Sequence, residues 1–292
     1  MKKKTLWQNF FENYIIRFSG ILTIIIMLLI VAFLIIDGFP FLFEYNFFKF
    51  LFSSDWYPLS SKFGALPLIF GSFYVTFLAA IMAVPLSLGT ALFISEIATP
   101  SLRTSLKVSL EILASVPSVV FGFLGILILG PFFESAFDIR TGLNAFTAAF
   151  LLAFMSIPTI ASVAEESLQS VPKALREGSL ALGANRFQTM MKITLPAAQS
   201  GIIAGIMLGV GRAIGETMTV MMVAGGSAQI NLGIFEPIRT ITGTIASEMG
   251  EVIHGDEHYH ALFMLGFILF MITLSINTIS SMVINKIKKS KG

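Results

Sequence analysis

The sequence predicts an all-α integral membrane protein with about six transmembrane helices. Of its 292 residues, 55% are hydrophobic and only 12% are charged, whereas soluble domains carry about 25% charged residues. The chain also contains long apolar runs, and a run of about 20 residues is enough to cross a bilayer. The alternative, a soluble helical protein with a very apolar core, is disfavoured because these runs are uninterrupted.

The first apolar run, 18–36, is predicted to be a retained span. It has no charged residue and exceeds the roughly 7–15 apolar residues of a signal peptide. It ends at Ile35-Ile36-Asp37-Gly38 rather than at a small-residue cleavage site. The remaining spans are expected at 67–95, 109–131, 143–164, 197–223 and 261–284.

Lysine and arginine are distributed unequally between the two sides of these spans. The amino-terminal tail, the connections 96–107 and 165–196, and the carboxyl tail hold 14 of the 19. The opposite side holds 4, and Arg212 lies inside a span. The positive-inside rule therefore places both termini in the cytoplasm. We expect a multi-pass protein of the inner or plasma membrane, surrounded by lipid.

The connection 165–196 is polar and long for a link between two spans. We predict a first helix that Pro172 opens, with Ser170 as its cap, and that ends at Gly183. A second helix should run from about Arg186 through Leu195-Pro196 into the fifth span. The first helix is amphipathic, so it could lie on the bilayer surface or dock on a soluble partner. The residues alone leave both interpretations open.

The same connection matches a known pattern, which is E-A-A followed by Gly and then by I-x-L-P. Glu177 opens the pattern, Gly183 follows six residues later and Ile193 sixteen later, and Leu195-Pro196 close it. Gly178-Ser179 replace the two alanines, which weakens the local helix slightly. This stretch resembles the coupling loop of ABC importer permeases. The resemblance implies docking on a cytoplasmic ATPase through Arg176, Glu177, Gly183, Ile193, Leu195 and Pro196.

The sequence lacks the features of an enzyme. It contains no G-x-x-x-x-G-K-[ST] phosphate loop, so ATP should bind a partner ATPase and this chain needs no cofactor of its own. No cysteine is present, which excludes disulfides and thiol catalysis. His254, His258 and His260 lie near acidic residues, but their spacing matches no metal motif. We therefore predict no metal site and no catalytic residue.

The fifth span carries two charged residues, Arg212 and Glu216. Their spacing of four places them on one helix face, and charges inside a membrane usually face a pore or a partner. Arg212 could bind an anion, with Glu216 balancing it or accepting a hydrogen bond from a protonated anion. The alternative is a salt bridge that fixes helix packing. Gly201, Gly205 and Gly209 have the small-xxx-small spacing of a close contact between helices.

Further motifs point to one branch of these permeases. GRAIGETMTVMMVAGG (211–226), PSVVFGF (117–123), EMGE (248–251) and HYHALF (258–263) resemble permeases for inorganic phosphate, in particular the PstC-like type. The resemblance covers about 65–285 and implies a type I, MetI-like permease core. It also implies that Arg212, Glu216 and Thr217 line the substrate path.

The resemblance also implies partners. These are a homologous PstA-like permease, a dimer of ATP-binding subunits and an extracytoplasmic phosphate-binding protein, with no nucleic acid. We expect 1–64 to hold the amino-terminal tail, the first span and an outer segment, 65–285 the permease domain, and 286–292 a basic cytoplasmic tail. The alternatives are a permease for another anion (sulfate or molybdate), or an ATPase-independent channel or secondary transporter.

Overall fold

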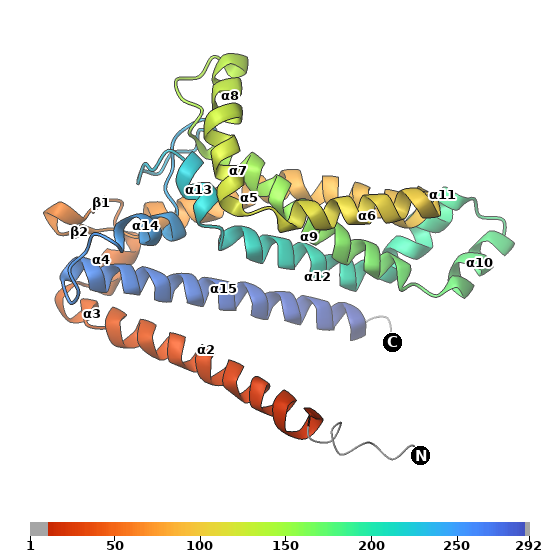
Figure 1. Cartoon of the computed structure of the whole chain (residues 1–292), viewed down its shortest axis with the longest axis horizontal. Coiled ribbons are helices and arrows are strands. Elements are labelled where there is room, and N and C mark those ends of the chain that lie inside the picture. The colour runs from red at the N-terminus through yellow and green to blue at the C-terminus, as the bar shows by residue number, and fades with distance from the viewer. Residues whose placement is uncertain (1–10, 290–292) are drawn as a thin grey trace.

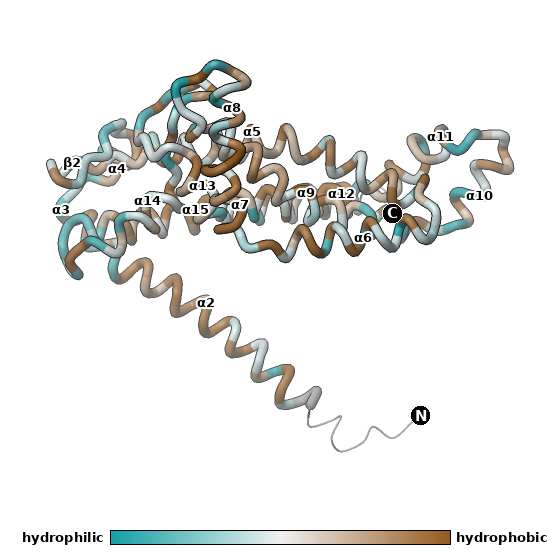
Figure 2. Tube along the Cα trace, turned by 45° about the horizontal axis from the view of Figure 1, so that its top comes forward, coloured by the Kyte–Doolittle hydropathy of each residue, from teal (hydrophilic) through white to brown (hydrophobic). Residues whose placement is uncertain are grey.

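In the computed structural model the long helices lie roughly parallel, apart from the first, which slants away from the bundle toward its N-terminal end, and polar segments lie at both ends of the bundle (Figures 1 and 2). The structure describes residues 11–289, with side chains from 14 to 287. The amino-terminal lysines and the end of the basic tail lie outside the described residues. Six segments of this part of the chain are long and apolar enough to cross a membrane, as predicted: Tyr14–Glu44, Leu66–Ile97, Ser118–Phe137, Ala145–Gln169, Arg186–Ile214 and Glu257–Ile287.

Three helices form the centre of the fold: α5 (Leu66–Leu92), α9 (Ala145–Gln169) and α12 (Leu195–Ile214). Helix α15 (Glu257–Lys289) packs against α12, and α2 (Arg17–Gly38), preceded by η1 (Phe11–Ile16), packs against α15. Most of α2 is exposed and apolar, which suits contact with lipid. Helix α2 begins and α15 ends at the same end of the bundle (Figure 1).

Glycines bring α12 close to α9. A Cβ added at Gly209 would lie 2.3 Å from Cγ1 of Ile160, and one at Gly205 would lie 3.1 Å from Cβ of Val163. A Cβ at Gly201 would collide with the side chain of Ser167. The predicted contact of this glycine series with another helix is therefore confirmed.

The third apolar segment is interrupted, which corrects the prediction of one continuous span over 109–131. Helix α6 (Pro100–Ser115) ends at Val116, whose ψ of 127° is extended. Pro117 explains this, because its ring disfavours the helical conformation of the residue before it. The chain then continues as α7 (Ser118–Leu124), η4 (Gly125–Leu129) and α8 (Gly130–Phe137).

The fifth apolar segment is also interrupted, so a continuous span over 197–223 is wrong. Helix α12 ends at Ile214, and α13 (Met218–Val223) begins after a break of three residues. In the other direction, α11 (Arg186–Thr189), η5 (Met190–Thr194) and α12 follow without a gap. The predicted passage from Arg186 through Leu195-Pro196 into the fifth span is confirmed.

Short elements close the end of the bundle opposite α10 (Lys173–Ala181) (Figure 1). The carboxylate of Glu248 connects several of these elements. It accepts a hydrogen bond from Trp56 Nε1 at 3.1 Å, and it pairs with Arg239 and with His258, the latter at 2.8 Å. The elements at this end are α3 (Phe41–Glu44), α4 (Phe47–Phe52), β1 (Trp56–Tyr57), η2 (Pro58–Ser60), β2 (Lys62–Phe63, antiparallel to β1) and α14 (Ile241–Glu248).

Candidate translocation and coupling sites

Arg212 and Glu216 lie on either side of a helix end, so the predicted shared helix face is wrong. Arg212 is in the last turn of α12, whereas Glu216 follows the C-cap residue Gly215. Nη1 of Arg212 donates a hydrogen bond to Oγ1 of Thr159 on α9, at 3.1 Å. No salt bridge joins Arg212 to Glu216 within the described part of the chain. The Arg212 side chain is exposed, which leaves its charge accessible.

Glu216 is held by the segment that follows it. Its Oε1 accepts a hydrogen bond from the backbone N–H of Thr219 at 3.4 Å, which satisfies one free amide at the start of α13. Its backbone oxygen accepts from Oγ1 of Thr242 at 3.0 Å. Thr217 donates from Oγ1 to the Gly215 oxygen at 3.2 Å. The helix break therefore has its own hydrogen bonds and is not simply an unwound helix end.

The two interrupted segments meet. Oγ1 of Thr219, a fully buried residue of α13, donates to the backbone oxygen of Ser118 at 2.8 Å. Ser118 is the first residue of α7, directly after Val116-Pro117. Irregular backbone inside membrane proteins is tolerated where protein buries it or where it lines a water-filled cavity, and broken helices often mark substrate sites of transporters. The structure thus brings Arg212, Glu216 and Thr217 to a paired helix break.

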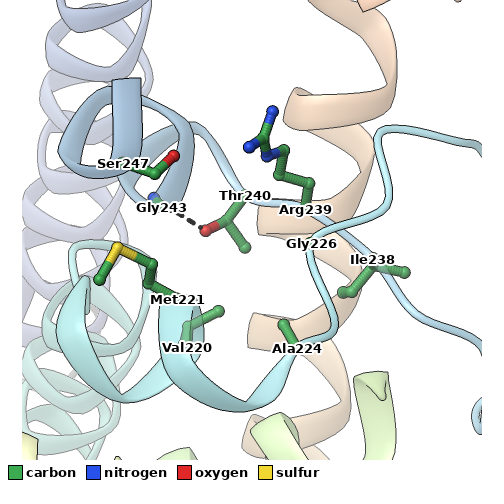
Figure 3. A pocket seen from close by; sticks show the side chains of 9 residues that line it. All are labelled: Val220, Met221, Ala224, Gly226, Ile238, Arg239, Thr240, Gly243 and Ser247. Atoms are coloured by element: carbon green, nitrogen blue, oxygen red, sulfur yellow. Dashed lines mark hydrogen bonds between the residues drawn. The ribbon is translucent and has the colours of Figure 1, made fainter. Parts of the chain in front are cut away.

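A small cavity of about 100 Å³ lies beyond this break, between α13 and α14 (Figure 3). Arg239 lines it and pairs with Glu248. Figure 3 also shows Thr240 accepting a hydrogen bond from the N–H of Gly243, at 3.2 Å. By sequence alone, Arg239 is one of the four lysine and arginine residues on the outer side, and nothing near it in the sequence identifies its partner.

The amphipathic helix of the 165–196 connection is present as α10, and it ends where predicted. Gly183 has φ +89°, a conformation that favours glycine, just after the C-cap. Asn185 and Gln188 then form a capping box that starts α11. Ser170 does not cap α10, which corrects that prediction: it is the C-cap of α9, and its Oγ donates to Ser167.

The residues predicted to couple to an ATPase differ in their surroundings. Glu177 and Gly183 are exposed on the α10 side of the turn, whereas Ile193 and Leu195 are half-buried where η5 joins α12. Pro196 is exposed in the first turn of α12. Arg176 points inward instead: its Nη1 lies 3.1 Å from Oε1 of Glu96, and its Nη2 donates to the oxygen of Leu168 at 2.6 Å.

A second ion pair lies at the same end of the bundle. Nζ of Lys107 on α6 is 2.7 Å from Oε2 of Glu165 on α9, and Gln169 also contacts that carboxylate. The Glu165 side chain is only 3% exposed. The sequence does not indicate this pair, because Glu165 directly follows the fourth predicted span and has the pattern of an exposed polar residue.

The three histidines make separate contacts. His258 pairs with Glu248, His260 Nδ1 lies 2.6 Å from the backbone oxygen of Asp37, and His254 packs on the ring of Tyr259. No group of three metal-ligating side chains is found among the described residues.

Comparison with known proteins identifies the class. The profile of the family described as "Binding-protein-dependent transport system inner membrane component" matches residues 92–289. The chain therefore belongs to this family of ABC transporter permeases. Its members are membrane subunits that are not catalytic alone, and this chain is an integral membrane protein of that kind.

Particular relatives extend the similarity beyond this region. The chain is 36% identical over 264 residues to "Phosphate transport system permease protein PstC" of Pasteurella multocida, covering 84% of this chain and 82% of the relative. It is 34% identical to the protein of the same name from Xylella fastidiosa, covering 84% and 81%. It is 38% identical to "Probable ABC transporter permease protein YqgH" of Bacillus subtilis, covering 80% and 77%.

Solved structures show the same fold. A chain of the inward-facing MetNI methionine ABC transporter superposes with a TM-score of 0.63 at 18% identity, covering 80% of this chain and 99% of that one. A bacterial ABC transporter involved in alginate import gives a TM-score of 0.64 at 16% identity, covering 97% and 99%. The predicted MetI-like permease core is therefore confirmed.

Proposed function

We propose that this chain is a permease subunit of an ATP-driven importer of inorganic phosphate and forms half of its translocation path. The observation that carries the proposal is the similarity to phosphate transport permeases over 84% of the chain. An accessible arginine beside two facing helix breaks supports it, since an oxyanion needs a positive site and hydrogen-bond donors. Arg212, Glu216 and Thr217 are the residues proposed to line the path.

The proposed complex contains a PstA-like permease, so that the path lies between two homologous halves. Two ATPase subunits would bind ATP and meet α10, and a phosphate-binding protein would meet the end that contains α14. The α10 end then faces the cytoplasm, with both termini on that side. The proposed division into 1–64, 65–285 and 286–292 assigns α2 and the segment with β1 and β2 to an amino-terminal addition.

The test is uptake of radiolabelled phosphate into vesicles that contain this chain, its sister permease, the ATPase and the binding protein. The proposal is supported if uptake of radiolabelled phosphate depends on ATP and is not inhibited by excess unlabelled sulfate or molybdate. Uptake of sulfate or molybdate in place of phosphate would assign another anion. Phosphate flux that needs no ATPase would indicate a channel or a secondary transporter and overturn the proposal.

A further inference from the structure

The coupling helix α10 has little apolar packing to hold it in place. None of its residues is buried, and its main contacts are with η5 and α11, which follow it in the chain. A helix without buried side chains is positioned by its polar contacts. Apart from Ser179 Oγ, 3.0 Å from Thr189 Oγ1, the side-chain bonds from described residues of α10 to other elements come from Arg176.

Arg176 joins α10 to two transmembrane segments at once. One nitrogen pairs with Glu96, which lies in η3 (Phe93–Ile97) at the end of the second span. The other bonds to the oxygen of Leu168, near the end of α9. The Arg176 and Glu96 side chains are only 24% and 17% exposed, so water and salt screen the pair less than a surface pair. The planar guanidinium can hold both partners in fixed geometry, which a lysine cannot.

The contact continues beyond η3. Nε of Arg103 on α6 donates to the oxygen of Ile94 at 2.9 Å, and its Nη2 donates to the oxygen of Ser95 at 2.6 Å. These are free carbonyls at the carboxyl end of a helix, where cations bind favourably. Glu96 therefore sits between two arginine-anchored contacts, one leading to α10 and one leading to α6.

We propose that Arg176 is a positioning residue that fastens the coupling helix to Glu96, so that α10, η3 and α6 move as one body when the ATPases close. Arg176 thus acts inside the permease rather than as a docking contact for the ATPase. The inference rests on the proposed transport function. It differs from a docking role in one respect: fastening requires that Arg176 pair with Glu96, whereas docking on the ATPase does not.

The test is charge exchange in the reconstituted complex, with ATP hydrolysis and phosphate uptake measured together. Arg176→Glu and Glu96→Arg should each lower uptake per ATP hydrolysed by about fivefold or more, the lower range of coupling between sites. The double variant should recover part of it, because the ion pair is restored with the charges reversed while the bond to the Leu168 oxygen stays lost. Lys286→Glu, an exposed charge reversal near the end of α15, is the matched control.

Two outcomes would overturn the assignment. One is an unchanged uptake of phosphate per ATP hydrolysed in Glu96→Arg. The other is a double variant whose uptake per ATP stays as low as in the single variants although the ATPase still co-purifies. A parent complex without phosphate uptake would instead overturn the proposed function. A second measurement does not depend on substrate. The chain has no cysteine, so spin labels at Ile97 and Leu180 should give a narrow distance distribution that broadens in Arg176→Ala. An unchanged width would reject the fastening role.

Discussion

Arg212 donates a hydrogen bond to the hydroxyl of Thr159, 3.1 Å away, and makes no ion pair with Glu216. Its charge is therefore oriented from α9 without being neutralised by a carboxylate. A cation oriented by a neutral partner keeps its ability to attract an anion. The contact therefore favours a role of Arg212 in substrate binding over a salt bridge with Glu216 that only fixes helix packing.

Arg212→Gln should lower phosphate uptake by about ten- to a hundredfold, the equivalent of a hydrogen bond to a charged group worth about 1.5–3 kcal/mol. Arg212→Lys should retain part of the activity, because the charge stays and the forked geometry is lost. Thr159→Val removes the orienting acceptor and should have a smaller effect. Uptake in vesicles is the measurement, and full activity of Arg212→Gln would refute the role.

Removing Lys107 should destabilise the protein more than neutralising its partner Glu165. Lys107→Met leaves a carboxylate that is only 3% exposed without its cation and should cost about 3–5 kcal/mol. Glu165→Gln should cost about 1 kcal/mol, because the lysine is 38% exposed and can turn to water. Thermal unfolding in detergent checks the order of the two variants. Equal losses would contradict the burial argument.

The α9–α12 contact should not tolerate a methyl group. Gly209→Ala places a Cβ against Ile160 and should cost about 1–3 kcal/mol. Gly89→Ala on α5 meets nothing within 4 Å and should be neutral or slightly stabilising. The midpoints of thermal unfolding of the two variants are compared. A Gly209→Ala protein as stable as the parent would mean that α12 can shift away from α9 without loss.

Of the two glycines in and after α10, only Gly183 in the turn should be required. Gly183→Ala forces a residue with Cβ to φ +89°, at about 1–2 kcal/mol, and should uncouple ATP hydrolysis from uptake. Gly178→Ala meets open space within α10 and should strengthen the helix while leaving coupling intact. Hydrolysis and uptake are measured in parallel. Normal coupling in Gly183→Ala would contradict the need for this turn.

The sequence predicts the membrane segments and the coupling connection well, because both depend on local signals. Length and hydropathy locate the six apolar segments, and Gly183 marks the turn after α10 through its backbone conformation. The glycines of α12 also have a recognisable spacing. These features need no knowledge of distant residues.

The helix breaks and ion pairs depend on tertiary contacts and were missed. Pro117 was visible in the third span, but prolines at 85 and 158 lie inside continuous helices, so proline alone does not mark a break. The break after Ile214 has no proline and is fixed by the bonds of Glu216 and Thr219. The pair of Arg176 with Glu96 joins residues far apart in the sequence, so no local signal identifies it.

The bond between Thr219 and Ser118 has a consequence for biogenesis. As the chain is synthesised, the segment that holds Ser118 enters the membrane before α13 exists. Until then, the break at Val116-Pro117 lacks its packing against α13, and hydrocarbon offers no hydrogen-bond partner for the carbonyls that α6 leaves free at its end. The early segment therefore depends on a shielded or hydrated site, such as the insertion machinery provides, until the fifth segment arrives. Chains truncated before Met218 should accordingly be retained there and degraded.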